Sequence, residues 1–488
     1  MVSEAMKNLG LQRDTPIDLL LINAPLRDYA ERPRVNNFTL PVLGLGYIAT
    51  YAEAQGFNVG VLDAEATGMT VADVVAFVNN SDPRWVGFNL LAPTYEMSAT
   101  IAAGLKASIK VILGGHQARA LPERILRDPR MHNCVALIVG EAEIRVTELL
   151  GDAAARQNLP LVYWLNRELD VIAAGRPEHA NPAYLAPDVN ALPFVNRKFL
   201  IDDPSPVDGR VRASMVGARG CPYDCSFCGA AVSANPDVTI RVRHPENILA
   251  EMDQLRSGYG VNAFRFVDDL FLGSKRVILN MTEAFLAERV GEWAVWDATG
   301  RINVLDRLND NQISALKEAG LSEFAVGIES GSPRILDLID KRIDPTMVTR
   351  VVERLVRIGI DVKGYFIFGF PGETSLEIEA TVELIERLWS VADGETGSFR
   401  ASAFEYRPYP GTPDWHRLVG TGRFTVNDLL DYRPVDFTGD GSRSHMNARD
   451  EFNFAIPTDL ADAPRHEVRS AVDKVAKEQY ARLTKWKF

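Results

Sequence analysis

Cysteine is scarce in this sequence. The 488 residues contain four, and three of them, Cys221, Cys225 and Cys228, lie close together. Four cysteines cannot form the disulfide network that would stabilise a chain of this length, so a disulfide framework is not expected and a metal or redox site is favoured. Long apolar runs are missing too, because no stretch approaches about 18 uncharged apolar residues, which argues against a membrane span.

A basic stripe is also absent. Lys and Arg number 53 against 65 Asp and Glu, which gives a formal net charge of −12 at pH 7. Contacts with phosphate groups need clustered Lys and Arg, so nucleic acid is not expected as the main partner. The start of the chain lacks the basic, apolar and small-residue zones of a secretory signal. We therefore expect a cytoplasmic protein that does not associate with a membrane.

The length exceeds that of one ordinary hydrophobic core and predicts two or three domains. Strand runs alternate with helical segments in the first third of the chain: "IDLLLINAP", "LGLGYIATYAEAQG", "FNVGVLDA", "WVGFNLLAP", "KVILGGH" and "VALIVGEAE". This alternation predicts an α/β domain in residues 1–175 with a doubly wound parallel sheet. Ligands of such sheets bind at the carboxyl edge of the strands, where we expect a binding face.

A second alternating series follows an interval rich in proline. Residues 176–210 show no sustained periodicity and predict an extended linker on the surface. Residues 211–415 then hold six strand runs, from "RASMVGARG" to "FRASAFEYRPYPGT", with helices between them. Since no dinucleotide-type Gly fingerprint accompanies these runs, they predict an open (β/α)6 barrel. Residues 416–488 are less regular, and we expect a small helical region there.

The spacing C-x3-C-x2-C places three thiols on one short loop after the first barrel strand. Structural zinc commonly takes four donors, and neither a His nor the fourth Cys lies nearby in the sequence. A redox dithiol needs only two cysteines. An iron–sulfur cluster with one iron free of a protein thiolate explains the count better, and that open iron would be the reactive position. Zinc with a distant ligand and a redox dithiol stay as alternatives.

"GCPYDCSFC" at the head of a six-strand barrel resembles the radical S-adenosylmethionine (SAM) enzymes. The resemblance implies a 4Fe-4S cluster held by the three cysteines, with SAM chelating the fourth iron. It also implies that one electron from the cluster cleaves SAM to methionine and a 5′-deoxyadenosyl radical, which takes a hydrogen atom from a small-molecule substrate. The electron would come from an external donor such as flavodoxin or ferredoxin. Tyr223 looks like the aromatic residue that often packs near SAM, and the alternative is a loop residue without that role.

The same resemblance assigns SAM contacts to the ends of later strands. "FVDDLF" places Asp268 and Asp269 near the position that binds the SAM amino group. Only one of two adjacent side chains faces the cavity, and we favour Asp268. Arg301 suits the SAM carboxylate, and Glu329 in "GIESGS" is similar to the ribose or methionine contact. Three residues of "GYFIFGFPGET" would flank adenine: Gly369, Pro371 and Gly372. The alternative for each carboxylate is an ion pair at the barrel rim.

The N-terminal domain resembles the cobalamin (B12)-binding domain that precedes many radical SAM enzymes, mostly methylases. Where a domain with an imidazole ligand shows D-x-H-x-x-G, this chain reads "DAEATG", so ligation of cobalt by His at that point is excluded and cobalamin stays a candidate cofactor. Gly114 and Gly115 would pass under the corrin ring or make a tight turn. We interpret His116 as a capping or surface residue and Cys134 as a small buried residue.

Two reactions fit this resemblance. One is a cobalamin-dependent C-methyltransferase reaction in natural-product biosynthesis. The other is the radical 1,2-diol dehydration of aminoglycoside biosynthesis. The missing His, the acidic balance suited to a sugar or amino-sugar substrate and the short C-terminal region favour dehydration. On the sixth strand, Glu405 would be a base or an ammonium anchor and Tyr406 a hydrogen donor, with a surface Glu and a packed Tyr as the alternatives. A non-catalytic iron–sulfur scaffold or sensor is the remaining hypothesis.

Overall fold

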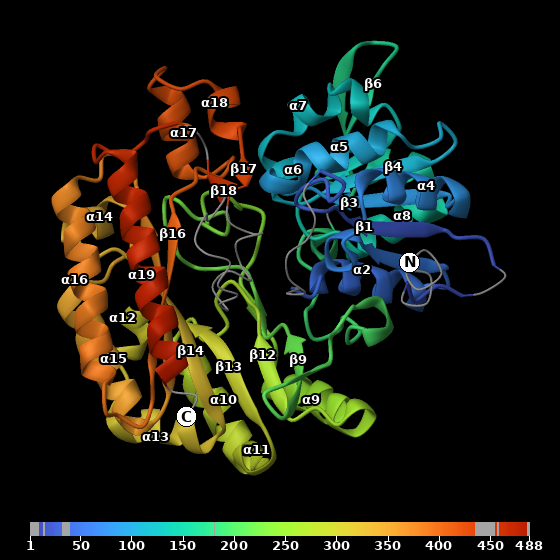
Figure 1. Ribbon diagram of the computed structural model, residues 1–488. Helices are drawn as coiled ribbons and strands as arrows, with labels where there is room; N and C mark the ends of the chain where they lie inside the picture. Colours follow the sequence, from blue (N-terminus) through green and yellow to red (C-terminus); the bar gives the residue numbers. More distant parts are fainter. Residues whose placement is uncertain are drawn as a thin grey trace. The chain divides into compact units, whose positions relative to one another are not determined.

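The computed structural model describes residues 9–12, 15–31, 40–179, 181–434, 454–455 and 458–485. The chain divides into two compact units (Figure 1). The first unit comprises Met1–Asp203, Ala234–Thr239 and Tyr409–Gly411, and the second comprises Pro204–Ser233, Ile240–Pro408 and Thr412–Phe488. The C-terminal residues therefore belong to the second unit and form no unit of their own.

The first unit is built on a seven-stranded sheet with the order β2-β1-β3-β4-β5-β6-β7. Five of its strands are parallel: β1 (Leu19–Asn23), β2 (Val59–Asp63), β3 (Trp85–Asn89), β4 (Lys110–Gly114) and β5 (Cys134–Ile138). They are short and largely apolar, as expected of parallel strands that are covered on both faces. The predicted doubly wound sheet is confirmed.

Helices cover both faces of this sheet: α2 (Leu43–Ala54), α3 (Ala64–Thr67), α4 (Val71–Ser81), α5 (Tyr95–Ala103), α6 (His116–Ala120), α7 (Pro122–Leu126) and α8 (Glu143–Gly151). Alternate residues of β1 enter two different cores. Leu20 and Ile22 pack in one hydrophobic cluster, and Leu19 and Leu21 pack in the other. This two-sided burial follows from the alternation of side chains along a strand.

The sequence did not reveal two strands at one edge of the sheet. β6 (Val162–Asn166) pairs antiparallel with β5, and β7 (Val171–Ala174) pairs antiparallel with β6. Both strands are short, and most of their residues are half-buried or exposed. Their hydrophobic pattern is weak for that reason.

The interval predicted as a surface linker packs against the first unit. Phe199 is buried in the same hydrophobic cluster as Leu45 of α2. A Cβ atom on Gly46 would lie 2.8 Å from Val195 Cγ1, which shows how closely this segment approaches α2. Arg197 also forms a buried ion pair with Asp203 at 2.9 Å. Widely spaced apolar residues thus hold this part of the predicted linker against the first unit, without any helical or strand period.

The second unit contains a seven-stranded sheet with the order β16-β15-β14-β13-β12-β9-β8. Six strands are parallel: β9 (Arg210–Met215), β12 (Ala263–Phe266), β13 (Val295–Gly300), β14 (Leu321–Glu329), β15 (Asp361–Phe368) and β16 (Phe399–Glu405). β8 (Ser205–Val207) adds an antiparallel strand beside β9. Among the described strands, β8 and β16 form the two edges of the sheet, so the barrel stays open. The predicted open (β/α)6 barrel is confirmed.

Helices lie along the outer face of this sheet (Figure 1): α9 (Pro245–Tyr259), α10 (Lys275–Ala287), α11 (Val290–Trp293), α12 (Ile302–Leu305), α13 (Asp310–Glu318), α14 (Pro333–Leu338), α15 (Pro345–Ile358) and α16 (Ser375–Ala392). Burial alternates along β15: Val362, Phe366 and Phe368 are fully buried, whereas Lys363 and Tyr365 are half-buried. Alternate side chains of the strand therefore face the helices and the interior of the open barrel.

The C-terminal part of the second unit contains α17 (Pro413–Gly420), α18 (Val426–Leu430), the short strands β17 (Arg433–Pro434) and β18 (Phe454–Ala455), and α19 (Arg465–Lys485). α19 runs beside the edge strand β16 (Figure 1). Gln479 Oε1 accepts hydrogen bonds from Ala401 N at 2.6 Å and Trp389 Nε1 at 3.1 Å. The helix thus satisfies an amide of an edge strand. No helix in the described ranges combines the length and apolar character needed to cross a bilayer.

Candidate active site

The three clustered cysteines lie on the loop that follows β9. Cys225 is buried, and Cys221 and Cys228 are half-buried. Within the described residues, no three Cys, His, Asp or Glu side chains form a group that would hold a single metal ion. A 4Fe-4S cluster is held by thiolates that bind different irons, so its ligands need not converge on one point. The arrangement fits a cluster better than the zinc alternative. The fourth cysteine, Cys134, was predicted to be buried; it is half-buried and packs against a hydrophobic cluster of the first unit.

The thiols sit in surroundings that favour the protonated form. Burial raises the pKa of Cys228 to about 12 and also raises the pKa of Cys221. The negative charge of Asp269 and the neighbouring thiols add to both shifts. Iron binds thiolates, so formation of a cluster must release these protons. We therefore expect assembly of the cluster to weaken as the pH falls.

The two adjacent aspartates after β12 have different environments. Asp268 is buried, and its Oδ1 accepts hydrogen bonds from Gly217 N at 2.8 Å and Ala218 N at 2.7 Å. These amides begin the cysteine loop, so Asp268 fixes the start of that loop. Asp269 is exposed, and its charge acts on the pKa of Cys221 and of Cys228. Asp268, which we favoured, is therefore bound to the backbone of the loop, and Asp269 is the aspartate whose charge acts on the thiols.

Arg301, at the end of β13, lies against the cysteine loop. Its Nη1 donates to Cys225 Sγ at 3.3 Å, and its Nη2 donates to the Lys341 carbonyl oxygen at 2.5 Å. The guanidinium carbon stands 3.6 Å from the centre of the Tyr223 ring, a close cation–π contact. The structure thus brings together Cys225, which was predicted to hold the cluster, with Arg301 and Tyr223, which were predicted to lie near SAM.

Glu329 ends β14 in an unusual backbone conformation, with φ 70° and a register shift between Gly327 and Glu329. Its Oε1 forms an ion pair with Lys341 Nζ at 2.6 Å, and both side chains are 7% exposed. Sequence reasoning missed Lys341, because it lies in a loop between α14 and α15 and follows no strand. The sequence feature that could have indicated Lys341 is its position directly after an apolar helix. A Lys that is buried there needs a buried acidic partner.

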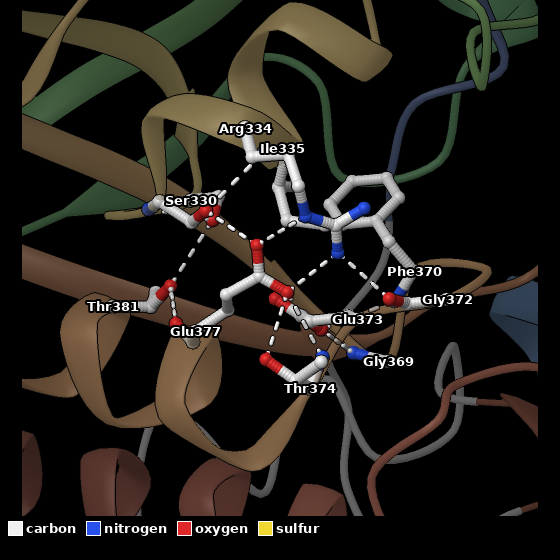
Figure 2. A network of polar contacts seen from close by, with 11 residues as sticks. Ser330, Arg334, Ile335, Gly369, Phe370, Gly372, Glu373, Thr374, Glu377 and Thr381 are labelled. Atoms are coloured by element: carbon white, nitrogen blue, oxygen red, sulfur yellow. Dashed lines mark hydrogen bonds and ion pairs between the residues drawn. The ribbon is translucent and has the colours of Figure 1, made fainter.

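The predicted adenine-binding turn follows β15, and two of its backbone amides donate hydrogen bonds to a buried carboxylate (Figure 2). Gly369 N donates to Glu373 Oε2 at 2.5 Å, and Phe370 N donates to the same oxygen at 3.1 Å. Burial raises the pKa of Glu373 to about 7. Gly369 and Gly372 have φ values of 88° and 74°, which favour glycine, and Pro371 between them is half-buried.

A second acidic residue fixes the other side of this turn. Arg334 Nε and Nη2 donate to the two carboxylate oxygens of Glu377 at 2.7 and 2.6 Å, and Nη2 also donates to the Gly372 carbonyl oxygen at 2.7 Å (Figure 2). Glu377 also accepts hydrogen bonds from Ser332 and Thr374. The hydrogen bonds from Arg334 lower the pKa of Glu377 to about 2. The turn is therefore held rigidly before any ligand binds.

Tyr406 is packed, as in the alternative that we gave, whereas Glu405 is a half-buried ion-pair residue and not a surface residue. Glu405 forms ion pairs with Arg465 at 3.3 Å and Arg469 at 3.7 Å, both on α19. Tyr406 is buried, and its hydroxyl donates to Asp414 Oδ2 at 3.2 Å. Burial raises the pKa of Tyr406 well above its usual value. This geometry does not support a positioned base at Glu405 or a free hydrogen donor at Tyr406.

Polar residues also gather at the carboxyl edge of the first sheet. Asn23 Nδ2 donates to Asp63 Oδ1 at 2.8 Å, which links the ends of β1 and β2. Glu65 occupies the position that His would hold in D-x-H-x-x-G. Its carboxylate accepts hydrogen bonds from Leu26 N at 2.8 Å and the Tyr29 hydroxyl at 2.7 Å. Glu65 therefore fastens the loop after β1.

The two glycines after β4 have different reasons to be glycine. A Cβ on Gly115, which has φ 96°, would lie 2.4 Å from Asn89 Oδ1, so Gly115 is required by the tight turn itself. A Cβ on Gly114 would make only an ordinary contact, 3.7 Å from the nearest atom. His116 is exposed at the start of α6, as predicted of a surface residue.

Two buried polar atoms near this edge lack a hydrogen-bond partner among the described residues: Gln117 Oε1 and Ser98 Oγ. Both side chains are almost fully buried, at 3% and 0% exposure. Buried polar atoms are nearly always paired, so these two atoms can each take a hydrogen bond that the described residues do not supply. Cobalamin carries amide side chains around its ring, and these residues fit it.

Comparison with known proteins matches two separate regions of the chain. Residues 215–385 match the radical SAM superfamily, and residues 35–150 match the B12 binding domain. These matches identify a radical SAM domain and a B12-binding domain within the chain. The radical SAM match implies a 4Fe-4S cluster and SAM as cofactors, and the B12-binding match supports cobalamin. The enzyme class expected from "GCPYDCSFC" is confirmed, and the non-catalytic scaffold is not supported.

Several relatives of this radical SAM enzyme are named as methyltransferases. An uncharacterized methyltransferase of Pyrococcus horikoshii is 28% identical over 86% of this chain and 86% of its own length. Cytidylyl-2-hydroxyethylphosphonate methyltransferase of Streptomyces wedmorensis is 26% identical over 76% of each chain. The solved structure of the radical SAM methyltransferase TsrM from Kitasatospora setae, with tryptophan and a SAM analogue bound, has a TM-score of 0.61 at 17% identity. It covers 83% of this chain and 76% of TsrM, and it shows the shared fold.

Proposed function

We propose that this enzyme is a cobalamin-dependent radical SAM C-methyltransferase that acts on a small molecule. The observation that carries the proposal is that both relatives described above, which align with three quarters or more of the chain, are named as methyltransferases. Methyl transfer therefore replaces the dehydration that the sequence alone favoured. The amino-sugar substrate expected with dehydration has no support in these relatives.

The second unit would bind the cluster and SAM. When bound, the cluster supplies the electron that cleaves SAM to methionine and a 5′-deoxyadenosyl radical, and methylcobalamin supplies the methyl group. Cys221, Cys225 and Cys228 would hold the cluster. Arg301 would bind the SAM carboxylate with its paired nitrogens while the Tyr223 ring keeps the guanidinium plane in place.

The remaining SAM contacts would come from neighbouring strand ends. Asp269, exposed on the side of the thiols, suits the SAM ammonium group as a carboxylate acceptor. Glu329 suits the ribose hydroxyls, and the turn from Gly369 to Gly372 would flank adenine. Glu373 keeps this turn in one conformation through its hydrogen bonds to the backbone amides.

The first unit would bind cobalamin at the carboxyl edge of its sheet. Gln117 and Ser98 offer buried neutral polar atoms, which suit the neutral amides of the corrin ring. Gly114 leaves room at the surface of this edge. Glu65 stays committed to the loop after β1, and no His stands at that position to bind cobalt.

The proposed reaction breaks one substrate C–H bond, whose hydrogen atom ends on 5′-deoxyadenosine, and forms one C–CH3 bond. A second SAM molecule renews the methyl group and leaves as S-adenosylhomocysteine. The two electrons consumed in each turnover come from an external one-electron donor, such as flavodoxin or ferredoxin. Each methyl group should therefore appear with one 5′-deoxyadenosine and one S-adenosylhomocysteine.

The proposal can be tested without knowing the substrate. Anaerobically reconstituted enzyme is incubated with cobalamin, a strong reductant and SAM that carries a trideuterated methyl group, then passed through gel filtration. We expect a corrin that stays with the protein, bears the labelled methyl group and is matched by S-adenosylhomocysteine. The control is free cobalamin under the same conditions. A protein that retains no corrin and still cleaves SAM to 5′-deoxyadenosine would support dehydration instead.

A further inference from the structure

Lys341 contacts two proposed SAM ligands through different atoms. Its Nζ pairs with Glu329 Oε1 at 2.6 Å, and its carbonyl oxygen accepts a hydrogen bond from Arg301 Nη2 at 2.5 Å. Lys341 and Glu329 are both almost fully buried. A buried ion pair contributes little to stability compared with apolar side chains of the same volume, so stability alone is a weak reason for this pair.

The backbone around Lys341 adopts an uncommon conformation. Asp340 and Arg342, on either side of it, have φ values of 51° and 56°, and Glu329 has φ 70°. Such values are costly for residues other than glycine, persist where the surroundings enforce them and are frequent at functional sites. Arg342 Nε and Nη2 grip the Asp340 carboxylate at 2.8 and 2.9 Å, which holds the turn.

Three successive carbonyl groups of this turn face the cluster loop and Arg301. The Ile339 oxygen accepts a hydrogen bond from Ser226 N at 3.2 Å, and the Asp340 oxygen lies 3.9 Å from Cys225 Sγ. The third is the Lys341 oxygen, which holds Arg301. The turn is therefore in contact with the cysteine loop and with the residue that would bind the SAM carboxylate.

The strand below leaves space for this ion pair. A Cβ on Gly327 would lie 2.2 Å from Glu329 Oε1 and 2.6 Å from Lys341 Nζ. A side chain at this position would displace the carboxylate and the ammonium group from their present contact. Two elements, the bulge in β14 and the turn after α14, are thus shaped around one contact.

We propose that Lys341 is a positioning residue for SAM, whose ammonium group orients Glu329 toward the ribose while its carbonyl group orients Arg301 toward the SAM carboxylate. The proposal rests on the SAM roles of Glu329 and Arg301 given under the proposed function. Lys341 would act through these two residues and not by chemistry of its own. Substitution of Lys341 can test the role of its ammonium group, because a substitution removes the side chain and keeps the carbonyl group.

The test compares SAM binding by the reconstituted holoenzyme and its variants. Lys341→Met removes the ammonium group and keeps the length of the side chain, and Lys341→Arg retains the charge. We expect K341M to weaken SAM binding about tenfold or more, measured by calorimetric titration with SAM, and K341R to recover most of the affinity. Iron and sulfide content should stay at the wild-type level, because no thiol has changed.

A double variant separates positioning from simple stability. K341M alone leaves Glu329 buried without its partner, which lowers the unfolding temperature. Glu329→Gln combined with K341M removes both charges, and we expect it to regain thermal stability but not SAM affinity. Arg197→Met with Asp203→Asn is the matched control, because it removes a buried ion pair from the first unit. That control should leave SAM affinity unchanged.

Two results would overturn the proposal: wild-type SAM affinity in K341M, or SAM affinity that returns with stability in the double variant. Neither result depends on methyl transfer. Wild-type protein that binds SAM normally but fails to label cobalamin would count against the proposed methyltransferase function and leave the role of Lys341 standing.

Discussion

The two sheets of this enzyme carry different chemistry at their carboxyl edges. In the first unit, Gln117 and Ser98 bring buried neutral atoms without partners. In the second unit, Arg301, Glu329 and Lys341 bring buried charges, and each already contacts another member of the group. The difference follows the proposed ligands, because a corrin presents neutral amides whereas SAM presents opposite charges beside an anionic cluster. The first edge also holds the buried carboxylates of Asp63 and Glu65, but these accept hydrogen bonds from Asn23 and from the loop after β1.

The largest effect should come from the thiols of the second unit. Cys225→Ala removes one of three cluster ligands, and we expect loss of the iron–sulfur absorbance and of 5′-deoxyadenosine formation from SAM. Cys134→Ala is the matched control, since Cys134 is a packed residue in the first unit. It should retain both signals. SAM cleavage by C225A at the wild-type rate would show that the loop holds no cluster.

Two carboxyl groups in the second unit should respond to pH with opposite sign. Burial raises the pKa of Glu373 to about 7, so the folded protein keeps a proton that the unfolded chain loses from about pH 4.5 upward. The stabilisation from this proton is complete below pH 4.5 and is lost as the pH rises to 7. The pKa of Glu377 is lowered to about 2 by Arg334, so its contribution is lost as the pH falls from 4.5 to 2.

Urea unfolding of Glu373→Gln at several pH values checks this contrast. Relative to the variant, the wild-type free energy of unfolding should fall by roughly 3 kcal/mol between pH 4.5 and 7. Glu377→Gln should differ from the wild type in the acidic range instead. A constant difference between wild type and E373Q across the whole range would show that Glu373 is ionised throughout.

In the first unit, substitutions of the neighbouring residues Gly114 and Gly115 should distinguish a loss of stability from a loss of cobalamin binding. Gly115→Ala places a Cβ in a positive-φ turn and against Asn89, and we expect a loss of about 1–3 kcal/mol in stability. Gly114→Ala meets no close atom and should leave stability nearly unchanged. Thermal unfolding and retention of cobalamin in gel filtration measure both effects. If G114A also unfolds early, the turn has less room than its geometry shows.

The smallest effect should come from Glu405→Gln. Its ion pairs with Arg465 and Arg469 are partly exposed, so we expect a stability change below about 1 kcal/mol and nearly wild-type SAM cleavage. Arg469→Ala should behave alike. A loss of turnover of about 100-fold or more in E405Q, with normal stability, would restore the role of general base that the sequence suggested.

Much of the fold was accessible from the sequence, because parallel strands buried on both faces leave continuous apolar runs. The five parallel strands of the first sheet and the six of the barrel follow from that pattern. β6 and β7 were not predicted, because they are short and half-exposed and their alternation of apolar and polar residues is weak. The packing of residues 176–203 was not predicted, because it depends on isolated apolar residues such as Val195 and Phe199. These residues follow no helical or strand period.

The site was only partly accessible for a related reason. The spacing of the cysteines is enough to identify them as cluster ligands. The choice between Asp268 and Asp269, however, depends on which side chain accepts hydrogen bonds from the backbone of Gly217 and Ala218. Lys341 joins Glu329 only because a bulge and a distant turn meet in space. Contacts between residues far apart in the chain leave no local pattern, so sequence reasoning could not supply them.

The assignment of this enzyme depends on whether the cysteine loop and the charged edge around it bind a cluster and cleave SAM. The most direct measurement is the yield of 5′-deoxyadenosine and methionine when anaerobically reconstituted enzyme meets SAM and a strong one-electron reductant. We expect both products in equal amounts, dependent on the reductant and absent without iron and sulfide. Reconstituted protein that carries neither labile sulfide nor any reductant-dependent cleavage of SAM would contradict the account.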